Sequence, residues 1–145
     1  MIRLICPHCQ TANRVPPERL ADQPTCGACK NPLLAGVHAL QVDTIEGLLQ
    51  QSAMPVIVDF WAPWCGPCRG FAPTFAAAAQ KYGGRLIFAK VDTESEQALG
   101  MRFNIRSIPT LGVFQGGKEL GRISGALPPA QLESLIGDVL KQASI

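Results

Sequence analysis

The sequence predicts an α/β fold, a sheet flanked by helices, with a small cysteine-rich module in front of it. Two observations predict this arrangement. From residue 37 onward, short apolar runs alternate with helix-type stretches in the order β-α-β-α-β-α-β-β-α. Before residue 37, two C-x2-C pairs lie in a segment too short to bury a core of its own. We therefore expect the 145-residue chain to form an N-terminal module of residues 1–36 and a main domain of residues 37–145.

The first four cysteines are spaced as metal ligands. Sixteen residues separate the pair Cys6/Cys9 from the pair Cys26/Cys29, a spacing within the range of four-cysteine zinc sites. Each C-x2-C turn brings two sulfurs to one ion, and two turns from the ends of a short hairpin complete a tetrahedron. We therefore expect a zinc ribbon in which all four cysteines hold one structural zinc ion, although such a site also accepts iron in expression hosts.

Two other interpretations of the first pair are less favoured. The tetrapeptide Cys6-Pro-His-Cys9 also forms the active site of certain strongly oxidising periplasmic proteins. Here we expect no buried strand in front of it, and a second pair follows at metal spacing. His8 could replace one cysteine as a ligand. With four thiols available, we expect it to be an exposed loop residue instead.

The formal charge of +2 lies entirely in the N-terminal module, which carries four basic and two acidic residues. Four thiolates and one divalent ion would bring this module close to neutral. Its basic residues therefore offset the charge of the metal site rather than bind phosphate, and we expect no nucleic-acid partner. Because the module is so short, its stability should depend on the metal.

Nothing in the sequence indicates export or membrane insertion. Residues 1–5 are too short an apolar stretch for a signal sequence, and no segment reaches transmembrane length. A disulfide framework of the secreted type is therefore not expected. We expect a cytoplasmic protein without membrane association, because thiols persist in a reducing compartment.

The elements of the main domain follow from breaker residues and hydrophobic periodicity. Asn31-Pro32 and Gly36 mark the boundary with the module. Asp43 or Thr44 is expected to cap the first helix, and Pro67 is tolerated in the first turn of the second. Branched apolar runs predict the strands. We expect strands at 37–42, 56–60, 86–91, 110–115 and 119–124, and helices from 44, from 65, at 94–103 and at 128–142.

The third cysteine pair, Cys65 and Cys68, has the features of a redox dithiol. It follows the apolar run of residues 56–60, at the predicted start of a helix. A free thiol with a pKa near ~8.5 is mostly protonated at neutral pH, and the thiolate is the attacking species. Free N–H groups at a helix N-terminus favour the thiolate of Cys65. Cys68, one helical turn further, would be shielded, so the pair is predicted to act as attacker and resolver.

Three motifs resemble those of the thioredoxin family. They are residues 58–69 around Trp-Cys-Gly-Pro-Cys, residues 106–110 (Arg-Ser-Ile-Pro-Thr) and residues 125–127 (Gly-Ala-Leu), in matching order and spacing. With the four cysteines in front, and Pro63 and Arg69 beside the dithiol, the whole chain resembles the zinc-containing second type of bacterial thioredoxin. The resemblance implies the thioredoxin fold, a central mixed sheet flanked by helices, and a monomer.

The resemblance also implies roles around the dithiol. Cys65 would attack a disulfide in a target protein, and Cys68 would resolve the mixed disulfide. Asp59 matches the family's buried carboxylate, which accepts the proton of the resolving thiol, and burial in an apolar run should raise its pKa. The alternative for Asp59 is a polar residue tolerated near a strand edge. Lys90 matches the family lysine near that carboxylate.

A substrate-docking surface is implied by the same resemblance. Pro109 matches a cis-proline beside the active site, although the sequence alone would favour a trans bond. The backbone of Ile108 would pair with the substrate chain. Phe60, Trp61 and Phe114 are assigned to packing. The shallow apolar docking surface would comprise Trp64, Gly66, Pro67, Gly125 and Ala126.

Three functions are compatible with these features. The leading one is a protein-disulfide reductase without a bound organic cofactor, which the resemblance implies is recharged from NADPH by a thioredoxin reductase. A disulfide oxidase or isomerase is less favoured, because Gly66-Pro67 between the cysteines accompanies reducing members of the family. The third is a zinc ribbon that senses oxidants or binds a partner, with the main domain as effector.

Two glycines depart from the expected pattern. Gly112 occupies a strand position where the family usually has a bulkier apolar residue, which indicates either looser packing or the close approach of a neighbour. Gly47 weakens the local propensity of the first helix.

Overall fold

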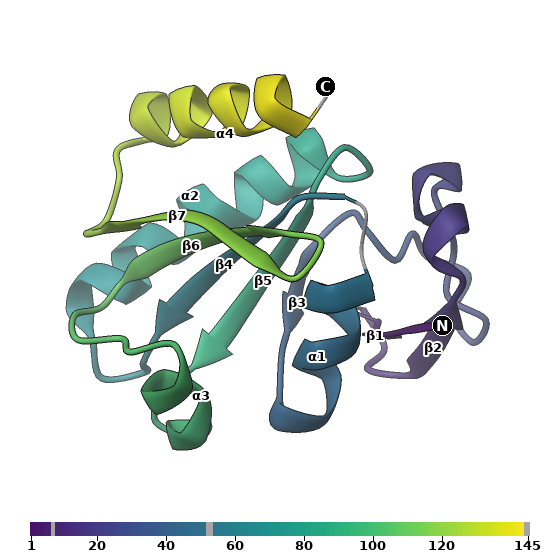
Figure 1. Cartoon of the computed structure of the whole chain (residues 1–145), viewed down its shortest axis with the longest axis horizontal. Coiled ribbons are helices and arrows are strands. Elements are labelled where there is room, and N and C mark those ends of the chain that lie inside the picture. The colour runs from purple at the N-terminus through teal and green to yellow at the C-terminus, as the bar shows by residue number, and fades with distance from the viewer. Residues whose placement is uncertain (7, 52–53, 144–145) are drawn as a thin grey trace.

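The computed structural model describes residues 1–6, 8–51 and 54–143 (Figure 1). Pro7, inside the first cysteine pair, lies outside the described residues, as do residues 144–145 of the expected main domain. The side chain of Asp43, one of the two expected helix caps, is likewise not described. All six cysteines are described.

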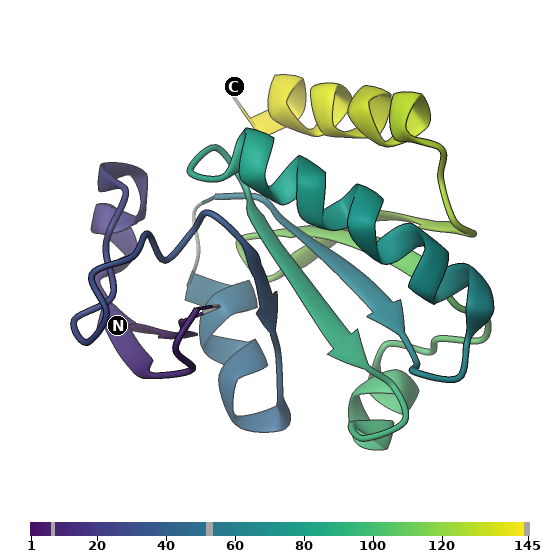
Figure 2. The same cartoon turned by 180° about the vertical axis from the view of Figure 1, so that it is seen from behind.

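A five-stranded mixed sheet forms the centre of the molecule, with strand order β3-β5-β4-β6-β7 (Figures 1 and 2). β3 and β4 run parallel to β5, β6 runs antiparallel to β4, and β7 runs antiparallel to β6. The apolar run of residues 56–60 is buried throughout and lies on the central strand, as predicted. The strands are β3 (Val37–Ala39), β4 (Val56–Trp61), β5 (Ile87–Asp92), β6 (Thr110–Gln115) and β7 (Lys118–Ser124).

Helices cover both faces of this sheet. Figures 1 and 2 show α2 and α4 on one face and α1 and α3 on the other. Two separate apolar clusters fill the two layers, and the aromatic rings of Phe71, Phe75 and Phe88 pack in the layer beneath α2. The helices are α1 (Val42–Gln51), α2 (Gly66–Tyr82), α3 (Gln97–Arg102) and α4 (Pro129–Ala143).

The N-terminal module is a two-stranded antiparallel ribbon followed by a 3-10 helix. Its elements are β1 (Ile2–Ile5), β2 (Ala12–Val15) and η1 (Pro17–Asp22). The expectation that no buried strand precedes Cys6 is wrong, because β1 buries Ile2 and Leu4 directly before it. The side chains of Ile2 and Leu4 pack in one apolar cluster with residues of the main domain. β1 nevertheless pairs only with β2 and is not a strand of the central sheet.

The ribbon and the central sheet share one apolar core. Leu4 and Leu33 of the N-terminal module belong to the same buried cluster as Leu48 of α1 and Val58 of β4. A polar link crosses the same interface, where Nδ1 of the buried His38 lies 3.1 Å from the backbone oxygen of Ile5. The domain boundary after residue 36 therefore stays a prediction, since burial across it is continuous.

The first predicted strand ends earlier than expected. β3 stops at Ala39, although the Leu40 N–H still donates to the Lys90 oxygen at 2.8 Å. The next N–H, that of Gln41, donates to Thr44 Oγ1 at 2.9 Å. This side-chain bond turns the chain into α1, so Thr44 does assist the helix start, from within its first turn.

The third helix starts later than predicted. The Oδ1 atom of Asp92, at the end of β5, accepts hydrogen bonds from the N–H groups of Glu94 at 2.9 Å and Ser95 at 3.3 Å. These bonds hold residues 93–96 in turns, and α3 begins only at Gln97. A carboxylate that satisfies these N–H groups outside a helix favours the turn over a longer helix.

Gly112 marks the close approach of a neighbour rather than loose packing. A Cβ atom at this position would lie 2.8 Å from the ring of Phe114 and 3.3 Å from that of Phe60. At Gly47 of α1 an added Cβ atom would make only an ordinary van der Waals contact, at 3.9 Å from the backbone nitrogen of Arg3. Glycine at 112 therefore admits the two aromatic rings to the sheet.

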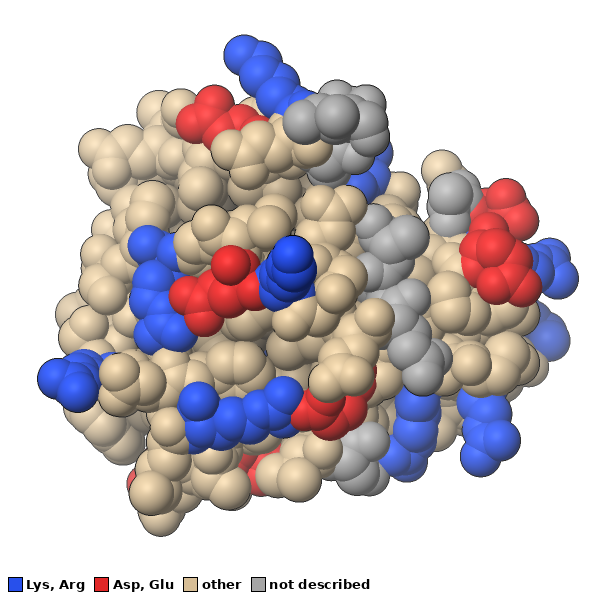
Figure 3. Space-filling model, in the orientation of Figure 1, with Lys and Arg blue, Asp and Glu red and all other residues tan. Residues whose placement is uncertain are grey.

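Charged side chains of both signs are interspersed on the face drawn in Figure 3. On β1 and β2, Arg3 lies opposite Arg14 in the antiparallel register. Across the described ranges, no helix combines the length and apolarity needed to cross a membrane. The absence of a nucleic-acid partner stays a prediction.

Candidate redox and metal sites

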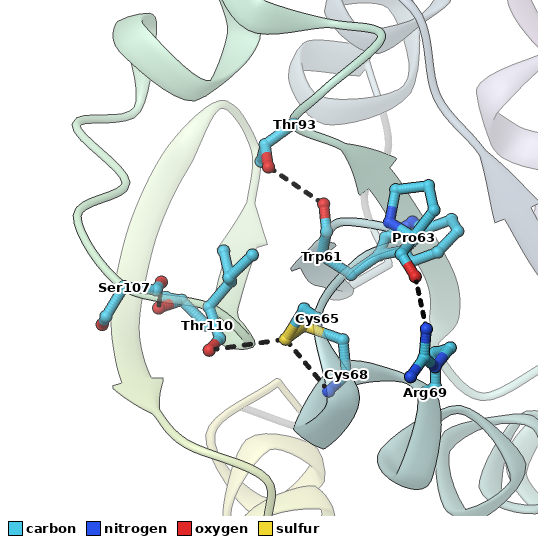
Figure 4. The surroundings of a disulfide bond; sticks show 9 residues. Trp61, Pro63, Cys65, Cys68, Arg69, Thr93, Ser107 and Thr110 are labelled. Atoms are coloured by element: carbon cyan, nitrogen blue, oxygen red, sulfur yellow. Dashed lines mark hydrogen bonds between the residues drawn. A yellow bond between two sulfur atoms is a disulfide. The ribbon is translucent and has the colours of Figure 1, made fainter.

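Cys65 and Cys68 form a disulfide at the N-terminus of α2 (Figure 4). Cys65 is the N-cap residue, and its sulfur accepts a 3.2 Å hydrogen bond from the Cys68 backbone N–H. The turn after β4 closes where the Cys65 N–H donates to the Ala62 oxygen at 3.1 Å. Cys65 is 5% exposed and Cys68 1%. The predicted N–H donation to the Cys65 sulfur and the shielding of Cys68 are both confirmed.

The loop before β6 lies against this disulfide. The Ile108–Pro109 peptide bond is cis, as the resemblance implied. The backbone oxygen of Ile108 lies 3.9 Å from the sulfur of Cys65. The Pro109 oxygen accepts a 2.8 Å hydrogen bond from the N–H of Gly125, whose φ of 108° suits glycine. This bond ties the third motif to the second, beside the dithiol.

The residues expected to form the docking surface differ in exposure. Trp64 is 67% exposed beside the buried disulfide, and Ile108 is half-buried. Pro109 is buried, so it shapes the loop rather than the surface. Arg69 anchors the turn by donating from Nη1 to the Pro63 oxygen at 3.1 Å (Figure 4). The other expected members are exposed, namely Gly66, Pro67, Gly125 and Ala126, and their docking role stays a prediction.

Asp59 is a buried carboxyl on the central strand. It is 4% exposed, and its Oδ1 has no hydrogen-bond partner among the described residues. Burial raises the pKa of Asp59 to about 7, although the charge of Lys90 acts to lower it. The expectation of a raised pKa is confirmed. A carboxyl with this pKa can accept and return a proton near neutral pH.

Lys90 pairs with Asp59 across the parallel register of β4 and β5. Its ammonium also lies 5.4 Å from the centre of the Trp61 ring, within cation–π range. Trp61 is half-buried, and its buried Nε1 has no hydrogen-bond partner among the described residues. Phe60 and Phe114 are buried and each packs on the ring of Phe103, as the packing assignment predicted. The lysine, the tryptophan and the carboxyl thus lie on the two neighbouring inner strands β4 and β5.

The other four cysteines converge at the tip of the ribbon. Their sulfurs all lie within 4.8 Å of one another, with Cys6–Cys29 and Cys9–Cys26 separations of 3.6 Å. Four sulfurs bound tetrahedrally to one zinc ion would lie about 3.8 Å apart. The four thiols therefore fit a metal ion. His8 is exposed and is not part of this group, as expected.

The two cysteine turns are near copies of each other. The Cys6 N–H donates to the Thr11 oxygen at 2.9 Å, and the Cys26 N–H donates to the Asn31 oxygen at 2.8 Å. The residue after each second cysteine adopts a left-handed backbone conformation, with φ of 67° at both Gln10 and Lys30. Repeated geometry of this kind is what two turns converging on one tetrahedral ion require.

Polar side chains that the sequence analysis missed surround the sulfurs. Thr11 Oγ1 lies 3.2 Å from the Cys9 sulfur, and the Asn31 amide donates to the Cys29 sulfur at 3.4 Å. Both residues lie two positions after the second cysteine of their pair, which is a spacing that could have indicated them. Asn13 donates to the Cys26 sulfur at 3.4 Å. No comparable spacing indicated Asn13.

These hydrogen bonds change the acidity of the thiols. Donation from the backbone of Cys29 and from the Asn13 amide lowers the pKa of Cys26 to about 6. Bonds with Thr11 likewise lower the pKa of Cys9, whereas burial raises that of Cys6. A thiol that ionises readily is a better metal ligand, because zinc binds the thiolate.

Comparison with known proteins places this geometry in a family. Residues 36–138 match the family model described as Thioredoxin. The chain belongs to the thioredoxin family. It is 41% identical over 140 residues to Thioredoxin C-3 of Corynebacterium nephridii, covering 96% of both chains. It is also 44% identical over 98 residues to a chloroplastic M-type thioredoxin of Chlamydomonas reinhardtii, covering 68% of this chain and 70% of that protein.

The fold and the ribbon agree with this assignment. The crystal structure of a thioredoxin from Malassezia sympodialis matches with a TM-score of 0.65 and 28% identity, covering 70% of this chain and 89% of that one. Residues 5–31 match the model of the thioredoxin 2 N-terminal zinc ribbon. The chain is thus a thiol-disulfide oxidoreductase of the thioredoxin family with the vicinal Cys65/Cys68 pair and a four-cysteine zinc ribbon. Membership implies disulfide-containing targets.

Proposed function

We propose that this thioredoxin is a general protein-disulfide reductase in which Cys65 and Cys68 supply two electrons to the target. The observation that carries the proposal is the position of Cys65. It caps α2, accepts the Cys68 N–H and lies beside the cis Ile108–Pro109 bond. A thiolate there is stabilised by the N–H and the helix dipole, while the exposed Trp64 leaves an apolar surface open to a protein partner.

The reaction starts from the reduced pair. The Cys65 thiolate attacks one sulfur of the target disulfide, which forms a mixed disulfide and releases the other target sulfur as a thiolate. Cys68 then loses its proton to Asp59, whose pKa of about 7 suits an acceptor near neutrality. The Cys68 thiolate attacks the Cys65 sulfur, frees the second target thiolate and restores the disulfide present in this structure.

Further parts of the proposal concern the surroundings of this cycle. Electrons from NADPH, delivered by a flavoprotein thioredoxin reductase, would return the disulfide to the dithiol. Target chains would pair with the backbone of Ile108 and lie across the surface around Trp64. We place the protein in the cytoplasm as a monomer, where the reduced pair would persist.

Reduction of insulin disulfides tests the proposal. With dithiothreitol, or with NADPH and a thioredoxin reductase, the chain should accelerate insulin reduction. Cys65→Ser should lower the rate to background, because the attacking sulfur is gone. Cys68→Ser should instead accumulate a covalent complex with the target, because resolution is blocked. An unaccelerated reaction with a fully reduced Cys65/Cys68 pair would contradict the assignment.

The oxidase and sensor alternatives have their own readouts. A redox-potential titration of Cys65/Cys68 separates a reductase from an oxidase. The reduction potential of a reductase lies near roughly −270 mV, as in reducing thioredoxins, and that of an oxidase near roughly −120 mV. Release of zinc at peroxide levels that leave Cys65 and Cys68 reduced would favour sensing by the ribbon. Zinc retained until the dithiol is oxidised would exclude that role.

A further inference from the structure

Asn13 joins the two cysteine turns. This half-buried residue lies on β2, after the first turn. Its Nδ2 donates to the Cys26 sulfur at 3.4 Å and to the Thr11 oxygen at 3.0 Å. Its Oδ1 accepts from the Gly27 N–H at 2.9 Å. Both amide hydrogens and the carbonyl oxygen are therefore engaged, and they connect the first turn to the sulfur and the backbone of the second.

The other polar side chains near the sulfurs each serve a single turn. Thr11 meets Cys9, two residues away, and Asn31 meets Cys29, also two residues away. Asn13 spans thirteen residues to reach Cys26. Its bonds therefore contribute to the distance and orientation between the turns, which the bonds of Thr11 and Asn31 do not.

The near symmetry of the two turns makes this role specific. Asn13 lies four residues after Cys9, and the position four residues after Cys29 is Leu33, which is buried in the apolar core. A leucine side chain cannot donate to a sulfur. Asn13 therefore joins the two turns from β2, whereas Leu33, at the equivalent position after the second turn, packs in the core shared with the main domain.

The chemistry of four thiolates explains why a donor belongs there. Four thiolates around one divalent ion carry a net negative charge, and N–H donors disperse it. Cys26 is fully buried, so water cannot supply this donation. Besides Asn13, the backbone N–H groups of Ala28, at 3.4 Å, and of Cys29 donate to the Cys26 sulfur, so Asn13 supplies the side-chain amide donor there.

We propose that Asn13 is a positioning residue of the metal site, which donates an N–H to the Cys26 thiolate and holds the turn of residues 26–29 against the turn of residues 6–9. It contacts a ligand and not the ion. The inference concerns the ribbon and does not depend on the reductase function.

Three variants of the full chain test it. Asn13→Leu removes all three hydrogen bonds, and Asn13→Asp keeps an acceptor for Gly27 but has no N–H. Asn31→Ala is the matched control, since it removes one amide donor from a sulfur without a link between turns. Each is loaded with Zn²⁺, and its affinity is measured by competition with a chromophoric chelator. We expect both Asn13 variants to lose about 10–100-fold in affinity and Asn31→Ala less than about tenfold.

Cobalt supplies a readout that a merely structural role would not move. In the Co²⁺-loaded chain, loss of the N–H raises the electron density on the Cys26 sulfur, so the sulfur-to-metal charge-transfer bands of Asn13→Asp should move to lower energy. Zinc affinity within about twofold of the unaltered chain in both Asn13 variants, or an equal loss in Asn31→Ala, would overturn the proposal. A loss in Asn13→Leu with unchanged affinity and spectrum in Asn13→Asp would overturn the donor role. Should Asn13→Leu fail to fold, Asn13→Asp alone decides.

Discussion

Asp59 of β4 and Lys90 of β5 lie directly opposite each other in the parallel register, with the carboxyl buried and the ammonium over the Trp61 ring. The two effects on the carboxyl oppose each other, and burial outweighs the nearby positive charge. The protein thus carries at its centre a carboxyl that is about half protonated at neutral pH.

This carboxyl should make stability fall as the pH rises. Its pKa rises from 3.8 in the unfolded chain to about 7 in the folded protein, so the folded state holds a proton that the unfolded state has lost. The contribution of Asp59 to the free energy of unfolding is therefore fully present below about pH 4, is lost as the pH rises through 7 and then levels off, with a total loss of at most about 4 kcal/mol. Urea unfolding of the oxidised protein measures it.

Asp59→Asn isolates that contribution. The variant should be more stable than the unaltered protein at pH 8, and the difference should shrink at pH 4. If the free energies of unfolding of the two proteins changed with pH in parallel, Asp59 would not be the titrating group.

Lys90→Met should shift the titration of Asp59 upward. Removal of the ammonium takes away the charge that lowers the pKa of Asp59, so that pKa should rise further. An NMR titration that follows the side-chain carboxyl carbon of Asp59 measures the midpoint directly. Lys118→Met, at the exposed start of β7, is the matched control and should leave the midpoint where it was. A midpoint that stays or falls in Lys90→Met would mean that Lys90 does not act on Asp59.

Gly112→Ala should destabilise the fold by about 1–3 kcal/mol, because the new methyl group would meet the Phe114 ring at 2.8 Å. Gly121→Ala on the neighbouring strand is the control, since a Cβ there meets nothing within 4 Å. Chemical denaturation compares the two variants. Equal stabilities would show that the rings move aside without cost.

Removal of the metal should destabilise the whole chain rather than the ribbon alone. Leu4 and Leu33 belong to the same buried cluster as Val58 of the central strand, so loosening of the ribbon opens the core beside β4. With a chelator, thermal unfolding followed by far-UV circular dichroism should shift to lower temperature as one transition. A main transition at an unchanged temperature, with a separate early loss of the ribbon, would argue for independent units.

The parts of the structure that the sequence predicted well are those with redundant signals. The strand at 56–60 is short, branched and apolar, and the dithiol follows it within a run of matching motifs, so pattern and resemblance agreed. The four sulfurs were predicted from spacing alone, because tetrahedral ligation constrains spacing.

What the sequence could not show depends on contacts between distant segments. The apolar stretch of residues 1–5 is too short to predict a signal sequence, and nothing in it indicates a buried strand, because that role depends on the face that α1 and β3 offer. Asn13 and His38 lie in short strands and belong to no recognisable motif, and only the folded structure brings them to Cys26 and Ile5. The late start of α3 depends on one carboxylate, that of Asp92.

The six cysteines serve two chemistries, and a joint count of zinc ions and reactive thiols distinguishes them. Zinc content and the number of rapidly reacting thiols are determined on reduced, anaerobically purified protein, before and after a chelator. We expect one zinc per chain and two fast thiols, Cys65 and Cys68, rising to six once Cys6, Cys9, Cys26 and Cys29 are released. Six fast thiols without metal, or disulfides among the first four cysteines, would contradict it.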